Sequence, residues 1–332
     1  MDINNRRQLH ETAKQRLNEA RDGAKIAVIF AGLITGTSLL SYLLNLFLGW
    51  QISGSTGLSG LSFRSTLGTL QTMLPLLFNF LLLALGLGFT GAMLRISRGQ
   101  YTSPKSMKIG FDRFWVLLRA TLLQSLLYSA VAFAAFYLAQ FVFLLSPLSN
   151  NFVTQATQMM ESSNASPMAL LEDPNLAAQM TRTLIPMFVL ALIFFLAGAV
   201  PIFYHLRLVS YILIDKPGQG ALLSMRESRK LMKGNCLRFF KVDLTMWWYY
   251  LAVILSMAVC YGDLLLSALG VSFSMPLQLV SSLFMAAYLV LLFLLTVFLE
   301  PHVQVVYGLC YDALRPQAPP SGGVVLGNIF NM

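Results

Sequence analysis

Six long apolar runs constrain this chain more than any other feature of its sequence. Each run holds the roughly 20 residues that an α-helix needs to cross about 30 Å of hydrocarbon. None of the runs alternates between apolar and polar residues, as the strands of a membrane barrel do. A backbone in lipid must satisfy its own hydrogen bonds, so continuous apolar runs of this length fold as helices. We expect spans at residues 26–49, 71–94, 114–145, 183–206, 243–268 and 276–299.

The composition indicates an integral membrane protein. Of the 332 residues, 56% are hydrophobic and 11% are charged, whereas about 25% of the residues of a soluble domain are charged. We therefore predict an all-α fold, a polytopic bundle of six transmembrane helices. The first span lacks a cleavage pattern at its end, so we interpret it as a retained signal anchor. The three cysteines have no metal-ligand spacing, and we expect neither a disulfide framework nor a metal or cofactor.

The distribution of Lys and Arg predicts the orientation of the spans. Of the 23 residues of these two types, all but two fall on one side of the predicted membrane, in the N-terminal segment, the second and fourth connections and the tail. The opposite side carries only Arg64 and Arg182. By the positive-inside rule, both termini of this multi-pass protein are cytoplasmic.

The charge map divides the chain into parts. Residues 1–25 are expected to form a cytoplasmic amphipathic helix whose narrow apolar stripe includes Leu9 and Ala13. Residues 26–314 form the six-span membrane domain, and residues 315–332 form a flexible cytoplasmic tail. The third connection, 146–182, faces outward, as a small polar cap or alternatively as an external binding lid.

Two segments that follow predicted spans are similar to each other. The segment "PIFYHLRLVSYILIDKP" begins at Pro201, and "PHVQVVYGLCYDALRP" begins at Pro301. Tyr211 and Tyr311 each follow ten residues later, and a weaker echo begins at Gly91. The repeat predicts three related helical hairpins, each followed by a cytoplasmic extension. Internal repeats are common in transporters, although duplication also builds bundles that transport nothing.

The fourth connection is the most strongly charged segment, and we predict a basic amphipathic helix within residues 217–241. At 100° per residue, Ala221, Leu222, Met225 and Met232 would share one face of this helix. The adjoining face carries cations at positions i, i+3, i+4 and i+7, which are Arg226, Arg229, Lys230 and Lys233. A basic stripe beside an apolar one is typical of a helix that lies in the headgroup layer and binds anionic lipid or a partner. The simpler alternative is that these cations only retain the connection in the cytoplasm.

Ionisable residues near the cytoplasmic ends of the spans are a second group of candidates, because polar groups inside a membrane are costly and often functional. They follow the fourth and sixth spans or begin the fifth: His205, Arg207, Asp243, Glu300 and His302. We predict that they form one polar cluster between the repeats. The cluster would serve structural pairing or, alternatively, a proton or ion relay.

The motifs "YILIDKP", "ESRKLMKGNCLRFFKVDL" and "PHVQVVYGLCYDAL" resemble a family of bacterial polytopic membrane proteins known only as a domain of unknown function, number 975. The N-terminal "RRQLHETAKQRL" also fits, so the resemblance covers nearly the whole chain. It implies a helical fold in a bacterial plasma membrane. A more distant likeness is to the membrane domain found ahead of some glycerophosphodiester phosphodiesterases. No phosphodiesterase domain is present, so neither resemblance supplies a substrate or a catalytic residue.

The sequence contains no P-loop, no H-E-x-x-H zinc motif and no G-x-S-x-G nucleophile motif. We therefore predict that the protein is not an enzyme and that it engages anionic lipid or a membrane-protein partner through its cytoplasmic basic helices. The alternative is a transporter or efflux component for a lipid-like or peptide substrate. Because the basic residues lie beside hydrophobic segments, we expect no nucleic-acid partner, and a homo-oligomer remains open.

Overall fold

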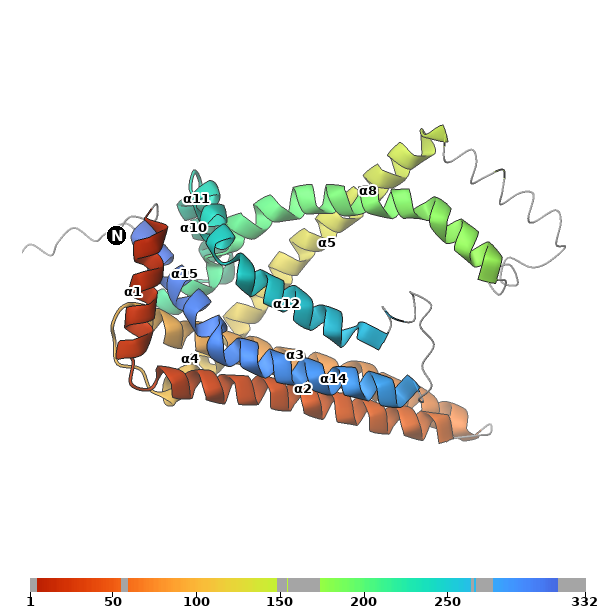
Figure 1. Cartoon of the computed structure of the whole chain (residues 1–332), viewed down its shortest axis with the longest axis horizontal. Coiled ribbons are helices and arrows are strands. Elements are labelled where there is room, and N and C mark those ends of the chain that lie inside the picture. Colours follow the sequence, from red (N-terminus) through yellow and green to blue (C-terminus); the bar gives the residue numbers. More distant parts are fainter. Residues whose placement is uncertain are drawn as a thin grey trace, which may run out of the picture. The chain divides into compact units, whose positions relative to one another are not determined.

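The computed structural model describes residues 5–54, 59–147, 154, 174–263, 266 and 277–315. The regular elements in these ranges are all helices, which confirms the predicted all-α class (Figure 1). In chain order they are α1 (Arg6–Glu19), α2 (Gly23–Gly54), α3 (Ser59–Ser97), η1 (Pro104–Lys108), α4 (Ile109–Asp112), α5 (Phe114–Leu144), α8 (Pro174–Leu206), α9 (Val209–Asp215), α10 (Ala221–Met232), α11 (Cys236–Thr245), α12 (Trp247–Cys260), α14 (Leu277–Phe298) and α15 (Glu300–Leu314).

Five helical stretches of the described chain are long and apolar enough to cross a membrane, and a bent pair of helices would make a sixth. The five are Gly23–Gln51, Leu67–Ser97, Phe114–Leu144, Ile185–Asp215 and Leu279–Phe298. They coincide with predicted apolar runs, although several extend beyond them. The chain therefore has the architecture of a polytopic helical bundle. Most of the predicted outer segment 146–182, and the tail beyond residue 315, lie outside the described residues.

The fifth predicted span, 243–268, differs from the prediction because it is not one continuous helix. α11 ends at Thr245 and α12 begins at Trp247, and the two helices are bent by 70°. The Thr245 hydroxyl donates to the carbonyl oxygen of Val242 at 2.6 Å, a local hydrogen bond of the kind that bends helices. Met246 between the helices is fully buried, so its side chain anchors the bend in the core.

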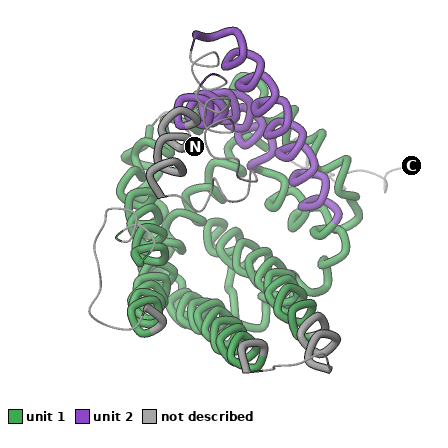
Figure 2. Tube along the Cα trace, turned by 90° about the vertical axis from the view of Figure 1, so that its right-hand side faces the viewer, with its two compact units in different colours: residues 1–118, 208–332 green, residues 119–207 purple. Residues whose placement is uncertain are grey.

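The chain divides into two compact units, residues 1–118 with 208–332 and residues 119–207 (Figure 2). In the first unit, α2 packs along α3 and α14, and α12 packs on α14. In the second unit, Gly198 of α8 lies so close to α5 that an added Cβ would be 2.7 Å from Cγ1 of Val131. Helices that follow one another thus pack as hairpins. That the hairpins are related to one another stays a prediction.

The long helices expose large apolar side chains. On α2, Leu43, Phe47 and Trp50 are 51%, 54% and 71% exposed, and on α5 Leu126 and Phe141 are 67% and 61% exposed. A soluble monomer rarely exposes a contiguous apolar patch larger than a few hundred Å². Surfaces of this kind fit contact with lipid, in agreement with a multi-pass membrane protein.

Nine residues of α15 are buried in the first unit. α1 packs on α15 with Leu9 and Ala13 fully buried. The apolar stripe of the N-terminal helix is therefore occupied by packing within the chain. α10 and α11 lie at the same end of this unit (Figure 1). Because α1, α10 and α11 are rich in Lys and Arg, we call the end formed by α1, α10, α11 and α15 the basic end.

Two glycines allow the short segment η1–α4 to contact the backbone of α3. A Cβ on Gly88 would lie 2.2 Å from the carbonyl oxygen of Met107, and one on Gly110 would lie 1.9 Å from the carbonyl oxygen of Ala84. At these positions only glycine fits without displacing one backbone from the other. Gly88 of α3 thus serves packing within the chain.

We expect Gly88→Ala to lower the thermal unfolding midpoint in mild detergent, because its methyl group would clash with the carbonyl oxygen of Met107. Overpacking of this kind costs about 1–3 kcal/mol. Gly86→Ala is the matched control, since no atom lies within 4 Å of its Cβ position and Ala is favoured over Gly inside a helix by about 0.5–1 kcal/mol. Equal midpoints for the two variants would contradict the packing described.

Candidate functional site

The predicted basic stripe forms one exposed face at α10. Its four residues are all exposed: Arg226, Arg229, Lys230 and, directly after the helix, Lys233. The opposite face of α10 is buried and consists of Ala221, Ser224, Met225, Ser228 and Met232. α10 packs on α9. We call the four exposed cations the basic face of α10.

Leu222 lies on the exposed side of α10 and not with the buried residues. The sequence pattern grouped it with Ala221 and Met225, yet Leu222 is 60% exposed and Leu223 is 57% exposed. The reason is that Ser224 and Ser228, which are fully buried, complete the packed face instead. The apolar face of α10 is thus covered by protein, and the helix presents outward four cations and two leucines.

The basic face of α10 carries unneutralised positive charge. None of its four cations forms an ion pair with another described residue. Glu227 on the same helix instead pairs with Lys216 and accepts a hydrogen bond from Gln219 at 2.9 Å. Like charges three or four residues apart on a helix repel each other. An external anion bound there would relieve this repulsion.

Two carboxylates of the predicted polar cluster accept hydrogen bonds from tyrosines. Asp243 is buried and accepts from the hydroxyl of Tyr307 at 2.6 Å. The Tyr307 hydroxyl also lies 2.8 Å from that of Tyr250. Glu300 accepts from the hydroxyl of Tyr249. These contacts connect α11, α12 and α15 at the basic end.

His205 and Arg207 of the predicted cluster belong to the second unit. The Arg207 guanidinium lies 4.8 Å from the ring centroid of Phe203 and 5.7 Å from that of Tyr204, a cation–π arrangement. The other three members belong to the first unit. Because the two units are described separately, a single cluster of all five residues stays a prediction.

His302, the remaining member, forms a pair with His10 of α1. His10 Nδ1 lies 3.0 Å from His302 Nε2, and His10 Nε2 lies 2.7 Å from Thr245 Oγ1. The single hydroxyl proton of Thr245 goes to the carbonyl oxygen of Val242, so His10 donates from Nε2 and accepts at Nδ1. His302 must then donate from its own Nε2. This pattern places one proton on each ring, at Nε2, which is a neutral form of both histidines.

Burial keeps both histidines neutral. It lowers the pKa of His10, and burial, followed by the charges of His10 and Lys14, lowers the pKa of His302 to about 4. A fully protonated pair would direct two N–H groups and two positive charges at each other. The docking of α1 on α11 and α15 thus includes a contact that requires deprotonated imidazole.

An ionic cluster around Arg98, which sequence reasoning missed, joins three elements of the first unit. Arg98 follows α3 directly and donates to both carboxylate oxygens of Asp312 at 2.6–3.1 Å. It also donates to Asp215, at the end of α9, at 2.9 Å. Asp215 in addition accepts from Tyr311 at 3.1 Å and pairs with Arg315 at 2.9 Å. The hydrogen bonds to Asp312 and Asp215 outweigh burial and raise the pKa of Arg98.

The repeat found in the sequence was the signal that could have revealed this cluster. The rings of Tyr211 and Tyr311 stack with centroids 5.8 Å apart. Tyr211 of α9 donates to the side chain of Gln304 on α15 at 2.8 Å, and Tyr311 of α15 donates to Asp215 on α9. The equivalent elements therefore contact each other reciprocally, and both aspartates of the cluster lie within four residues of a repeated tyrosine.

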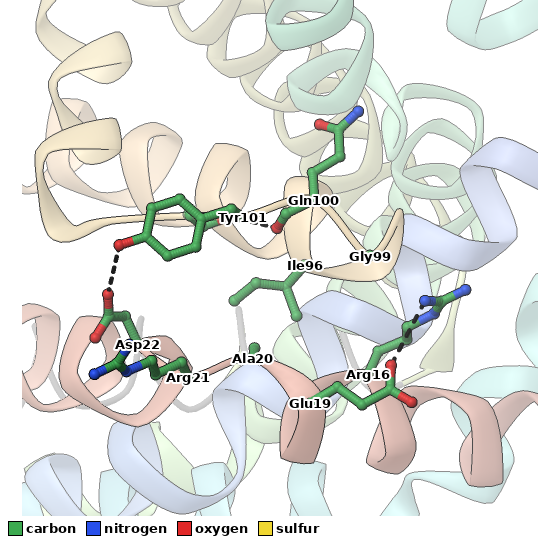
Figure 3. Close-up of a pocket in the computed structure, with 10 residues that line it drawn as sticks. Arg16, Glu19, Ala20, Arg21, Asp22, Ile96, Gly99, Gln100 and Tyr101 are labelled. Atoms are coloured by element: carbon green, nitrogen blue, oxygen red, sulfur yellow. Dashed lines mark hydrogen bonds and ion pairs between the residues drawn. The ribbon is translucent and has the colours of Figure 1, made fainter.

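A pocket of about 360 Å³ lies between the turn that joins α1 to α2 and the turn after α3 (Figure 3). Tyr101 donates to Asp22 at 3.2 Å, and Arg16 lies 3.6 Å from Glu19 across the same wall. Asp22 also pairs with Lys25 at 3.0 Å. Much of the charge in this pocket is thus neutralised locally, and the basic face of α10 is the stronger candidate for an anionic ligand.

The described ranges contain no group of three or more His, Cys, Asp or Glu residues arranged as metal ligands. Cys236, Cys260 and Cys310 are free thiols. The basic face of α10 therefore remains the site whose chemistry is best defined.

We expect Arg98→Ala to destabilise the protein by about 2 kcal/mol, because it leaves Asp312 without its fork of hydrogen bonds in a partly buried position. Arg98→Lys should recover only part of this loss, since one ammonium group cannot bind two carboxylates in the same geometry. Arg95→Ala, at an exposed position one turn earlier, is the control and should change the thermal midpoint little. A midpoint for Arg98→Ala equal to that of the control would contradict the role of the cluster.

We expect the basic end to lose stability as the pH falls from about 6.5 towards 4. The folded protein lowers both histidine pKa values, so in this window the unfolded chain binds protons more readily, and the stability present above pH 6.5 declines. At about 1.36 kcal/mol per pKa unit, and allowing for partial exposure, the loss at His302 is about 2 kcal/mol. This loss of stability is measured by the thermal unfolding midpoints at pH 7.5 and 5.0 and by hydrogen exchange of the α1 amides.

The double variant His10→Gln with His302→Gln should flatten this pH dependence, whereas His205→Gln in the second unit should preserve it. An unchanged pH dependence in the double variant would show that other groups cause the loss.

The family model described as "Protein of unknown function (DUF975)" matches residues 1–318, a range that runs through α15. No curated protein and no solved structure matches the chain, so the likeness to the membrane domain of glycerophosphodiester phosphodiesterases stays a prediction. The match agrees with the motifs quoted from α9, α10, α11 and α15, and the chain belongs to this family of proteins of unknown function.

Proposed function

We propose that the protein is a non-enzymatic membrane protein that binds anionic lipid headgroups through the basic face of α10. The observation that carries the proposal is the exposure of four cations on a helix whose opposite face is buried. None of the four has a carboxylate partner among the described residues. Each cation near an anionic membrane surface contributes about 1 kcal/mol before screening by salt. Together they favour anionic over zwitterionic lipid at this surface.

The proposal assigns the basic end to the cytoplasmic side of a bacterial plasma membrane. The N-terminal segment and the fourth connection, both rich in Lys and Arg, contribute α1, α10 and α11 to this end (Figure 1). The positive-inside rule makes such an end cytoplasmic. Anionic lipids give the cytoplasmic leaflet its negative surface potential. The basic face would therefore meet its ligand without a further partner.

An acidic segment of another membrane protein is the second binder that would suit the basic face. Lipid is favoured because Leu222 and Leu223 are exposed beside the cations. Leucines next to a basic face add apolar contact at a membrane surface, whereas they would add nothing to a purely ionic contact. We therefore take lipid as the ligand and the protein partner as an outcome of the test.

The test is native mass spectrometry of the full chain in mild detergent, titrated with phosphatidylglycerol or phosphatidylcholine. One variant replaces the four cations of the basic face by Ala. The control variant removes the same charge from exposed, unpaired cations elsewhere, Arg6, Arg95, Lys105 and Lys108. We expect the affinity for phosphatidylglycerol to fall about tenfold or more in the first variant and less than twofold in the control. Phosphatidylcholine binding should not change.

Equal losses in the two variants would show that net charge alone attracts lipid, and no loss in either would refute the proposal. A protein that copurifies from the native membrane with the wild type but not with the first variant, while lipid binding is unchanged, would replace lipid with a protein partner.

A further inference from the structure

α11 carries two apolar faces, of which only one is packed. Phe239 and Val242 are buried, with 0% and 1% exposure, and point into the first unit. Leu237 and Leu244, at i and i+7 on the other side, are 66% and 53% exposed. In a water-soluble helix of ten residues, this second face would be polar. Its leucines need an apolar environment that the first unit does not supply.

Two cations accompany the exposed leucines of α11. Lys241 lies at i+4 from Leu237 and therefore on the same face, and Arg238 is its neighbour on the helix surface. Both are exposed, and neither forms an ion pair with another described residue, although Arg238 donates to the side chain of Asn235 at 3.2 Å. Long cationic side chains on an apolar face extend their charge towards lipid phosphates while their stems stay in contact with the acyl chains. The face thus has the charge and apolarity of a helix at an anionic membrane surface.

The bend between α11 and α12 gives this face its orientation. α12 is apolar, and its Leu251, Ile254 and Leu255 are 53%, 65% and 59% exposed, as expected for a helix in hydrocarbon. α11 is bent from α12 by 70°, so when α12 enters a membrane along its normal, α11 runs nearly along the membrane surface. Trp247 at the bend is 62% exposed, and tryptophan is enriched at the membrane interface. The bend therefore places α11 at the level of the headgroups.

We infer that α11 is an interfacial helix: Leu237 and Leu244 insert below the phosphates of the membrane that α12 enters, and Arg238 and Lys241 bind the phosphates of anionic phospholipids. This inference rests on the proposed function in one respect, that the lipid at the basic end is anionic. The inference differs from the proposed function in the helix that contacts lipid and in the way that helix contacts it. The basic face of α10 attracts lipid from above the headgroups, whereas α11 is embedded among them.

The test measures the depth of α11 with nitroxide labels. Leu237→Cys or Leu244→Cys is labelled in a full-length background whose three native cysteines are replaced by Ala, in nanodiscs of phosphatidylglycerol or phosphatidylcholine. Oxygen, which partitions into lipid, and a water-soluble nickel chelate compete to relax the label. We expect oxygen to dominate at both positions, at a depth of about 5–10 Å below the phosphates. A label at Arg229→Cys, on the basic face of α10, is the control and should be relaxed mainly by nickel.

A second experiment tests the preference of α11 for anionic lipid. Arg238→Ala with Lys241→Ala should make the labels shallower in phosphatidylglycerol, to the depth seen in phosphatidylcholine. The four-alanine variant of α10 should leave the depth unchanged. A loss of phosphatidylglycerol binding without any insertion of α11 therefore refutes the inference alone, and insertion without a role for the α10 cations refutes the proposed function alone.

Nickel relaxation at 237 and 244 as strong as at 229 would overturn the inference, because the leucines would then face water. Exclusion of both reagents would overturn it as well, because protein would then cover the face. Should the cysteine-free background not assemble, Leu244→Trp in the native chain replaces it. Its added fluorescence should be quenched by lipids brominated near the headgroup, at least twofold more than by lipids brominated at the chain ends.

Discussion

The fork of hydrogen bonds from Arg98 fixes the geometry on which the basic end depends. Within a membrane the hydrophobic effect does not hold helices together, because lipid is as apolar as the helices are. Where the chain leaves the hydrocarbon, polar groups can supply the missing specificity. Arg98 binds Asp312 and Asp215 at once, and so sets α9 and α15 against the end of α3. α15 in turn carries side chains that contact α1 and α11, such as His302, which pairs with His10 of α1.

The two basic helices show how packing decides what an amphipathic sequence offers to its surroundings. α10 and α11 both look like interfacial helices when only the spacing of their cations and apolar residues is considered. In α10, three apolar residues and two serines are buried against the protein, and the four cations are left exposed together with Leu222 and Leu223. In α11, Phe239 and Val242 are buried in the core, whereas Leu237 and Leu244 are exposed. The two helices therefore expose different proportions of charge and apolar surface: four cations beside two leucines at α10, and two cations beside Leu237 and Leu244 at α11.

Much of the fold was accessible from the sequence because hydrocarbon imposes a minimum length on each span. The helical class and the positions of the long helices follow from that length alone. The break at Met246 did not follow, since the apolar pattern continues through it; the Thr245 hydroxyl bonds to the carbonyl oxygen of Val242 at this point. The exposure of Leu222 was missed because Ser224 and Ser228 were not counted as core residues. His10, Arg98, Asp215 and Asp312 were missed as sites because their partners lie about 100 to 300 residues away.

The hydrogen bonds of Asp243 and Glu300 favour a structural role for these carboxylates over a proton or ion relay. A relay needs an acceptor that can exchange its partner during turnover. Asp243 instead binds Tyr307, which contacts Tyr250, and Glu300 binds Tyr249 as well as Gln304. These hydrogen bonds join two different helices or two residues of α15. Breaking one would therefore loosen the packing of the first unit. Asp243 and Glu300 thus join α11, α12 and α15 through hydrogen bonds, while the cations of α10 and α11 are exposed.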